Sequence, residues 1–223
     1  MRWKFILGLL TTCAVLMSMS YTMLIPFLPM YLIQDLGVVK ADVDMWSGAI
    51  FAITFLVSGI MAPIWGALAD KKSRKLMALR AGFCLAITYF LGGLVSNPWE
   101  LLGVRFIQGL SAGLWPALLA IISVESPKLK LGFCMGVMQG GMTAGGVLGP
   151  LFGGLLADQF GMRMAFFIAA AALFLITLAL FFFVKEEPRK PDPNAKPVKI
   201  WDFSLCKIPA VKRMLIKSEA KRS

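Results

Sequence analysis

The chain has 223 residues, of which 58% are hydrophobic and only 16% are charged. Soluble globular domains are about half apolar and about one-quarter charged, so this composition excludes that class and indicates a membrane protein. The formal net charge of +11 does not indicate nucleic-acid binding, because the basic residues gather in short segments between apolar runs and in the tail. The chain has no His, the commonest metal ligand and general base, and we therefore expect neither a metal site nor an enzyme.

Six stretches are long and apolar enough to cross a bilayer, which takes about 20 mostly apolar residues. They cover residues 5–34, 45–69, 76–96, 98–124, 131–157 and 163–184. Most Lys and Arg before residue 185 fall at ends that share one side of such an arrangement, and short loops rich in these residues stay in the cytoplasm. We expect a multi-pass protein of the cell membrane, embedded in the lipid bilayer with both termini cytoplasmic.

The first span carries polar residues along one helical stripe and ends at two prolines. The stripe consists of Thr11, Ser18 and Thr22. It either lines a substrate cavity, with Tyr21 as the neighbouring candidate, or hydrogen-bonds to an adjacent helix. Pro26 and Pro29 are expected to bend or break the helix near its outer end.

A charged turn follows the second span. Asp70 and Arg74 stand at the spacing of a helical ion pair, and Gly66 removes side-chain bulk just before them. The pattern Gly66-x-Leu68-Ala69-Asp70 recurs as Gly154-x-Leu156-Ala157-Asp158 at the end of the fifth span. Three spans separate the copies, so they face opposite sides of the membrane, as inverted-topology repeats do. This predicts an all-α membrane protein of six transmembrane helices, arranged as two inverted three-helix repeats.

The turn is similar to a known loop signature. Gly66-x-Leu68-Ala69-Asp70-x-x-Ser73-Arg74-Lys75 resembles the loop between helices 2 and 3 of the major facilitator superfamily, with Ser73 where the family usually has Gly. The resemblance implies that Gly66, Asp70 and Arg74 form part of the inner gate, with the Asp engaging a helix of the transporter's other half.

The fourth span holds Arg105, the charge placed deepest in an apolar run. An arginine there either extends along the lipid face to the surface or faces the bundle interior, and nearby Gln108, Gly109 and Gly113 favour the interior. The stretch from Leu101 to Gly113 is also similar to the fourth-helix signature of proton-coupled superfamily members. That resemblance implies a role for Arg105, beside Gln108, in proton coupling, although no acid is visible in the middle of the other spans.

The fifth span is rich in glycine. Gly141, Gly145, Gly149 and Gly153 recur every four residues, a spacing that lets two helices approach closely, and Pro150 bends the helix. The run from Gly145 through Gly149, Pro150 and Gly153 matches the fifth-helix signature of antiporters in the superfamily, which implies efflux.

Two further residues of the fifth span are candidates for the substrate cavity. Met138 and Gln139 lie near the glycine rows, and flexible Met side chains suit loosely selective apolar binding. Filling of the helical core is the alternative role for the Met.

The composition changes after residue 184. Residues 185–193 are charged and rich in proline, which predicts a flexible linker, and they resemble the central cytoplasmic loop of a twelve-span transporter. We therefore expect a six-helix domain over 1–184 and a cytoplasmic linker and tail over 185–223, which ends before a seventh span.

Together these features resemble the amino-terminal half of a bacterial drug:proton antiporter of the superfamily. The resemblance implies efflux of small hydrophobic or amphipathic compounds by alternating access, with the proton gradient as energy source and no cofactor. Substrate is held between two halves in this family, so transport requires a missing second half or a homodimer. The alternative is a truncated, non-transporting half that only binds other membrane helices.

Overall fold

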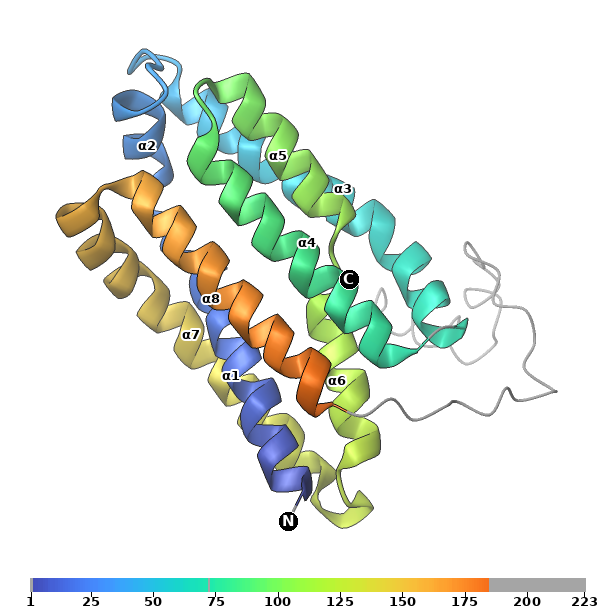
Figure 1. Ribbon diagram of the computed structural model, residues 1–223. Coiled ribbons are helices and arrows are strands. Elements are labelled where there is room, and N and C mark those ends of the chain that lie inside the picture. Colours follow the sequence, from blue (N-terminus) through green and yellow to red (C-terminus); the bar gives the residue numbers. More distant parts are fainter. Residues whose placement is uncertain (1, 72, 185–223) are drawn as a thin grey trace, which may run out of the picture. The chain divides into compact units, whose positions relative to one another are not determined.

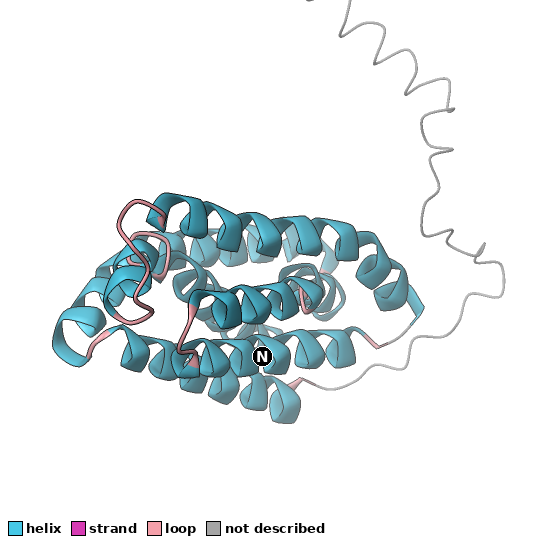
Figure 2. Ribbon diagram, turned by 90° about the horizontal axis from the view of Figure 1, so that it is seen from above, coloured by secondary structure: helices cyan, strands magenta, loops and turns pink. Residues whose placement is uncertain are grey.

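The computed structural model describes residues 2–71 and 73–184, and these residues form helices and connecting turns without a strand (Figures 1 and 2). Side chains within this range are described except those of Arg2, Gly66, Ala67, Ala69, Asp70 and Lys71. The helices are α1 (Arg2–Met23), α2 (Leu28–Gln34), α3 (Val43–Lys71), α4 (Arg74–Leu94), α5 (Pro98–Leu110), α6 (Leu114–Glu125), α7 (Leu131–Phe160) and α8 (Met162–Phe183). The predicted linker and tail over 185–223 lie outside the described residues.

Six segments of the described chain are long and apolar enough to cross a membrane, which confirms the predicted all-α membrane fold. The first segment differs from the single span predicted over 5–34. It divides into α1 and the seven-residue α2, which is too short to cross a bilayer. Pro26 lies in the break and Pro29 lies in the first turn of α2, as expected, because proline lacks the backbone N–H that continues a helix.

The fourth segment corrects a second prediction. The single helix expected over 98–124 is interrupted between α5 and α6 at residues 111–113. Gly113 has a φ of +118° in the left-handed region, where only glycine is free of strain, so the helix cannot continue through it. Pro116, in the first turn of α6, also lacks an N–H to donate back across the break.

The pairing of helices follows the predicted repeat. The most extensive contacts join α1 to α7, α4 to α8, and α3 to α5. Counted as spans, these pairs are first with fifth, third with sixth, and second with fourth. A two-fold rotation that exchanges the first three spans with the last three converts the first–fifth pair into the second–fourth pair. It leaves the third–sixth pair unchanged. The pairing therefore agrees with two inverted three-helix repeats.

The contact between α1 and α7 rests on the predicted glycine row. A Cβ atom at Gly153 would lie 2.8 Å from the Cβ of Met23, and one at Gly145 would overlap the backbone carbonyl of Val15. The second row of Gly132, Gly136 and Gly140 has no neighbouring atom in that direction. One glycine face of α7 therefore brings two backbones together, while the other is open.

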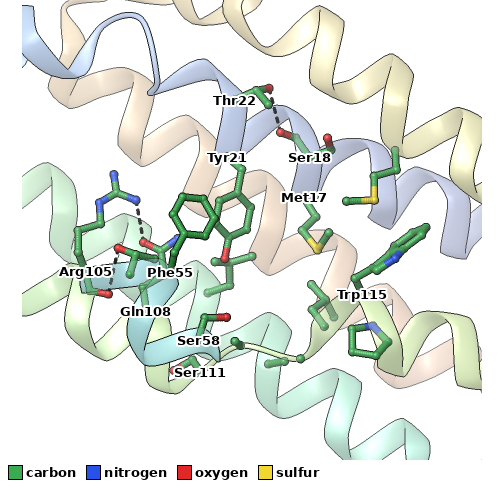
Figure 3. Close-up of a pocket in the computed structure, with 18 of the residues that line it drawn as sticks. Met17, Ser18, Tyr21, Thr22, Phe55, Ser58, Arg105, Gln108, Ser111 and Trp115 are labelled. Atoms are coloured by element: carbon green, nitrogen blue, oxygen red, sulfur yellow. Dashed lines mark hydrogen bonds between the residues drawn. The ribbon is translucent and has the colours of Figure 1, made fainter. Parts of the chain in front are cut away.

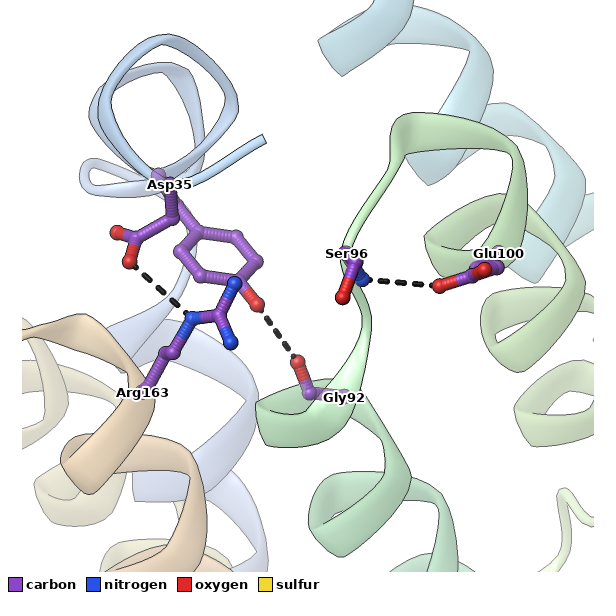
Figure 4. Close-up of polar contacts among 6 residues, drawn as sticks. Asp35, Gly92, Ser96, Glu100 and Arg163 are labelled. Carbon is purple, nitrogen blue, oxygen red and sulfur yellow. Dashed lines mark hydrogen bonds and ion pairs between the residues drawn. The ribbon is translucent and has the colours of Figure 1, made fainter. Parts of the chain in front are cut away.

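Polar contacts tie α2 to the bundle (Figure 4). The buried hydroxyl of Tyr31 donates to the carbonyl of Gly92 at 2.9 Å, in the last turn of α4, where helix carbonyls lack partners. Burial is the main cause that raises the pKa of Tyr31 to about 12, so the hydroxyl keeps its proton near neutral pH. Arg163 Nε lies 3.3 Å from Asp35 Oδ1, with both side chains partly exposed.

These two contacts are expected to differ in strength. Tyr31→Phe leaves the Gly92 carbonyl without its partner inside the protein and should lower the free energy of unfolding by about 1–3 kcal/mol. Arg163→Gln removes a partly solvated ion pair and should cost at most about 1 kcal/mol. Unfolding of the purified chain in detergent by added dodecyl sulfate, followed by circular dichroism, measures both. A larger loss for Arg163→Gln would contradict this ranking.

Candidate functional site

A cavity of about 420 Å³ lies between α1, α3, α5 and α6 (Figure 3). We call it the central cavity. Its polar and aromatic lining includes Ser18, Tyr21, Ser58, Arg105, Gln108 and Trp115. Between these groups lie apolar side chains, among them Met17, Phe55 and Met142. A few polar groups set in an apolar wall are typical of sites that bind small organic molecules.

The polar stripe of the first span serves both of the roles left open by the sequence. Ser18, Tyr21 and Thr22 line the central cavity. Thr22 Oγ1 also donates to the Ser18 carbonyl at 3.0 Å and lies 3.5 Å from the Gly145 carbonyl of α7. Thr11, the remaining member, faces Gly141 of α7 and does not line this cavity.

Arg105 faces the bundle interior, as predicted, because only 6% of the residue is exposed. Its Nη1 donates to Gln108 Oε1 at 2.7 Å, and its Cζ atom is 5.9 Å from the ring centroids of Tyr89 and Phe166. Thr54 of α3 approaches the Arg105 carbonyl at 3.4 Å, which helps to hold α5 in place. The side chain therefore does not extend along the lipid face.

The charge of Arg105 lacks a counter-ion among the described side chains. Its Nε and Nη2 atoms are buried without a hydrogen-bond partner there, as is Nε2 of Gln108. Burying a cation without an acid costs several kcal/mol, and ionisable groups inside a membrane bundle usually mark functional sites. Arg105 thus places an uncompensated cation beside the central cavity.

The predicted gate residues are only partly described. The side chains of Gly66 and Asp70 lie outside the described set, so their predicted contact with Arg74 stays a prediction. Arg74 begins α4 and borders a second cavity, described below. Ser73, which stands where the superfamily usually has Gly, caps α4 by accepting a hydrogen bond from the Leu76 N–H at 3.2 Å.

Two candidate residues of the fifth span lie elsewhere. Met138 is fully buried in the core, Gln139 is exposed, and neither lines the central cavity, so their place in a substrate cavity stays a prediction. Met142, one helical turn beyond Met138, lines it instead. Trp115, which no sequence pattern indicated, also lines the cavity, because the helix breaks just before it.

The sequence comparisons agree with this geometry. A family model described as Major Facilitator Superfamily matches residues 10–219. The chain belongs to the major facilitator superfamily. This superfamily chain is 42% identical over 186 residues to the multidrug resistance proteins MdtG of Salmonella paratyphi A and Salmonella arizonae. The alignments cover 83% of the chain and 46% of each relative, so the chain spans about half the length of these relatives.

Solved structures of other transporters share the fold. A bacterial homologue of the human lysosomal transporter Spinster superposes with a TM-score of 0.71 at 22% identity, covering 87% of this chain and 46% of the other. The human organic anion transporter MFSD10 gives a TM-score of 0.69 at 21% identity, covering 82% and 48%. The described helices therefore form a six-helix half of the superfamily fold.

Proposed function

We propose that this chain is one half of a proton-coupled efflux transporter for small hydrophobic or amphipathic compounds. The observation that carries the proposal is the buried, uncompensated charge of Arg105 on the wall of the central cavity. The likeness to multidrug resistance proteins supports this choice of substrate class. Apolar parts of a substrate would contact Phe55 and the flexible side chains of Met17 and Met142, which adapt to different shapes.

Arg105 would couple transport to the proton gradient by stabilising a carboxylate in its charged form. No acid among the described residues lines the central cavity, so the carboxylate would belong to the second half. Protonation of that acid would remove its attraction to Arg105 and release it. The gradient would thereby favour one direction as the two halves rock about the central site.

A second six-helix half would pack against α3 and α7. These are the two least buried of the six spans, and α7 carries the open glycine row. Small residues let helices approach closely in lipid, where no hydrophobic force drives association. The alignment covers 46% of the relative's length, so the rest of the relative is long enough for a second half of similar size. The partner would be the missing second half or another copy of this chain, and Asp70 and Arg74 would form the inner latch against it.

The second candidate is a non-transporting half that only binds other membrane helices. It is favoured by the observation that the chain aligns with only 46% of the relative's length. Transport in vesicles with a pH gradient separates the two, with a fluorescent lipophilic cation as substrate. The chain is tested alone and together with the remaining part of the Salmonella paratyphi A relative. Gradient-driven movement in either arm supports the transporter, and movement in the first arm supports a homodimer. Movement in neither would leave the non-transporting half.

We also propose that both termini face the cytoplasm in the cell membrane. Leu129, in the basic turn before α7, and Gln159, at the end of α7, are exposed and lie at opposite ends of that helix. In a chain with Cys206 replaced by Ser, an impermeant maleimide added to intact cells should label Gln159→Cys and not Leu129→Cys. Equal labelling of both would contradict the orientation and the inverted repeat.

A further inference from the structure

A second cavity of about 400 Å³ lies between α3, α4 and α6, and we call it the inner cavity. Its lining includes Trp65, Arg74, Met77, Arg80, Gly113 and Ala117. It shares the helix break at Ala112 and Gly113 with the central cavity. The predicted gate accounts for Arg74, but neither the gate nor the proposed coupling by Arg105 accounts for Trp65 and Arg80.

The chain builds this site around the break in the fourth span. The guanidinium carbon of Arg80 lies 3.3 Å from the centroid of the Trp65 ring, and Arg80 Nη2 donates to the Ala112 carbonyl at 3.1 Å. Trp65 Nε1 donates to the Leu110 carbonyl at 2.8 Å. These bonds give donors to carbonyls that have no partner at the end of α5, and they fix the ring and the guanidinium in one orientation.

These contacts leave one nitrogen of the Arg80 guanidinium without a hydrogen-bond partner among the described residues. Arg80 Nε is buried and has no hydrogen-bond partner among the described residues. Arg74 borders the same cavity, and no carboxylate belongs to the described lining. Two arginines therefore place positive charge beside one cavity.

The remaining wall is apolar, with Met77, Ala117 and the ring of Trp65 facing the same space. A guanidinium donates charge-assisted hydrogen bonds to the oxygens of a carboxylate or a phosphate. We propose that the inner cavity binds the carboxylate or phosphate group of a small amphipathic molecule, whose apolar part rests on this wall. Binding there requires no second half and does not depend on the proposed transport.

The test uses the purified full chain in dodecyl maltoside, which contains no phosphate. The probe is 4-bromobenzoate, whose bromine quenches the fluorescence of a nearby Trp, and 4-bromobenzyl alcohol is its neutral counterpart. Trp65 in the wall reports occupancy. We expect saturable quenching by the anion and only weak, unsaturable quenching by the alcohol. Equal quenching by both would overturn the proposal.

Three variants locate the site. Arg80→Gln should weaken binding of 4-bromobenzoate by at least about tenfold, since it removes a charged hydrogen-bond donor. Ala120→Phe fills the inner cavity from α6 without removing a charge and should do the same. Lys75→Gln is the matched control, because Lys75 lies over the ring of Phe181 outside the cavity. If Arg80→Gln fails to fold, Ala120→Phe decides, and unchanged affinity in that folded variant refutes the assignment.

Competition distinguishes the sources of the negative group. Inorganic phosphate and short-chain dihexanoylphosphatidylglycerol are each titrated against bound 4-bromobenzoate. Stronger displacement by phosphate indicates an anion from the aqueous phase, whereas stronger displacement by the lipid indicates a lipid headgroup. Displacement by neither restricts the site to carboxylates. In each case, weaker binding of 4-bromobenzoate in Arg80→Gln supports the assignment to the inner cavity, whereas unchanged binding contradicts the assignment.

Discussion

Gly149→Ala should destabilise the six-helix bundle by about 2–3 kcal/mol, a large effect for one added methyl group. The new Cβ would overlap Thr22 Oγ1 and lie 2.7 Å from the Met19 carbonyl and 3.1 Å from the Met23 backbone nitrogen. Backbone atoms of α1 cannot rotate away as a flexible side chain does, so α1 and α7 must separate. Unfolding by dodecyl sulfate, followed by circular dichroism, measures the loss.

The same helix supplies a control of opposite sign. Gly140 lies on the open row, with no atom near the position of an added Cβ. Gly140→Ala therefore gains helix propensity without a clash and should stabilise the isolated chain by up to about 1 kcal/mol. Equal destabilisation by the two substitutions would show that general loss of glycine, rather than the contact with α1, sets the cost.

Arg105→Gln should reduce gradient-driven transport at least about tenfold, because it removes the cation that donates to Gln108. The same substitution should leave the free energy of unfolding unchanged or raise it, since a buried charge without a counter-ion destabilises the fold. The two-arm vesicle assay measures transport, and unfolding by dodecyl sulfate measures stability.

The opposite directions of these two effects separate a functional arginine from a structural one. Arg163→Gln serves as the matched control, because Arg163 pairs with Asp35 and does not line the central cavity. It should keep most transport. Retained transport in Arg105→Gln, or loss of transport together with loss of stability, would contradict the proposed coupling role.

Sequence patterns determined the features that follow from length and local chemistry. Span length is set by bilayer thickness, and the predicted membrane fold agrees with the six apolar helices. The glycine row at Gly145, Gly149 and Gly153 predicted a close helix contact, because only glycine permits backbones to meet. The small and polar neighbours of Arg105 likewise predicted its place inside the bundle.

Only the tertiary structure decided which side of each helix faces the cavities. In lipid, the outer and inner faces of a span are both apolar, so the hydrophobic pattern of α7 does not separate Met138 and Gln139 from Met142, the residue that lines the central cavity. The break at Gly113 was also hidden, because a glycine that packs closely and one with positive φ look alike in sequence. At that break Trp65 donates to the Leu110 carbonyl and Arg80 donates to the Ala112 carbonyl, although the two residues lie 15 positions apart along the chain.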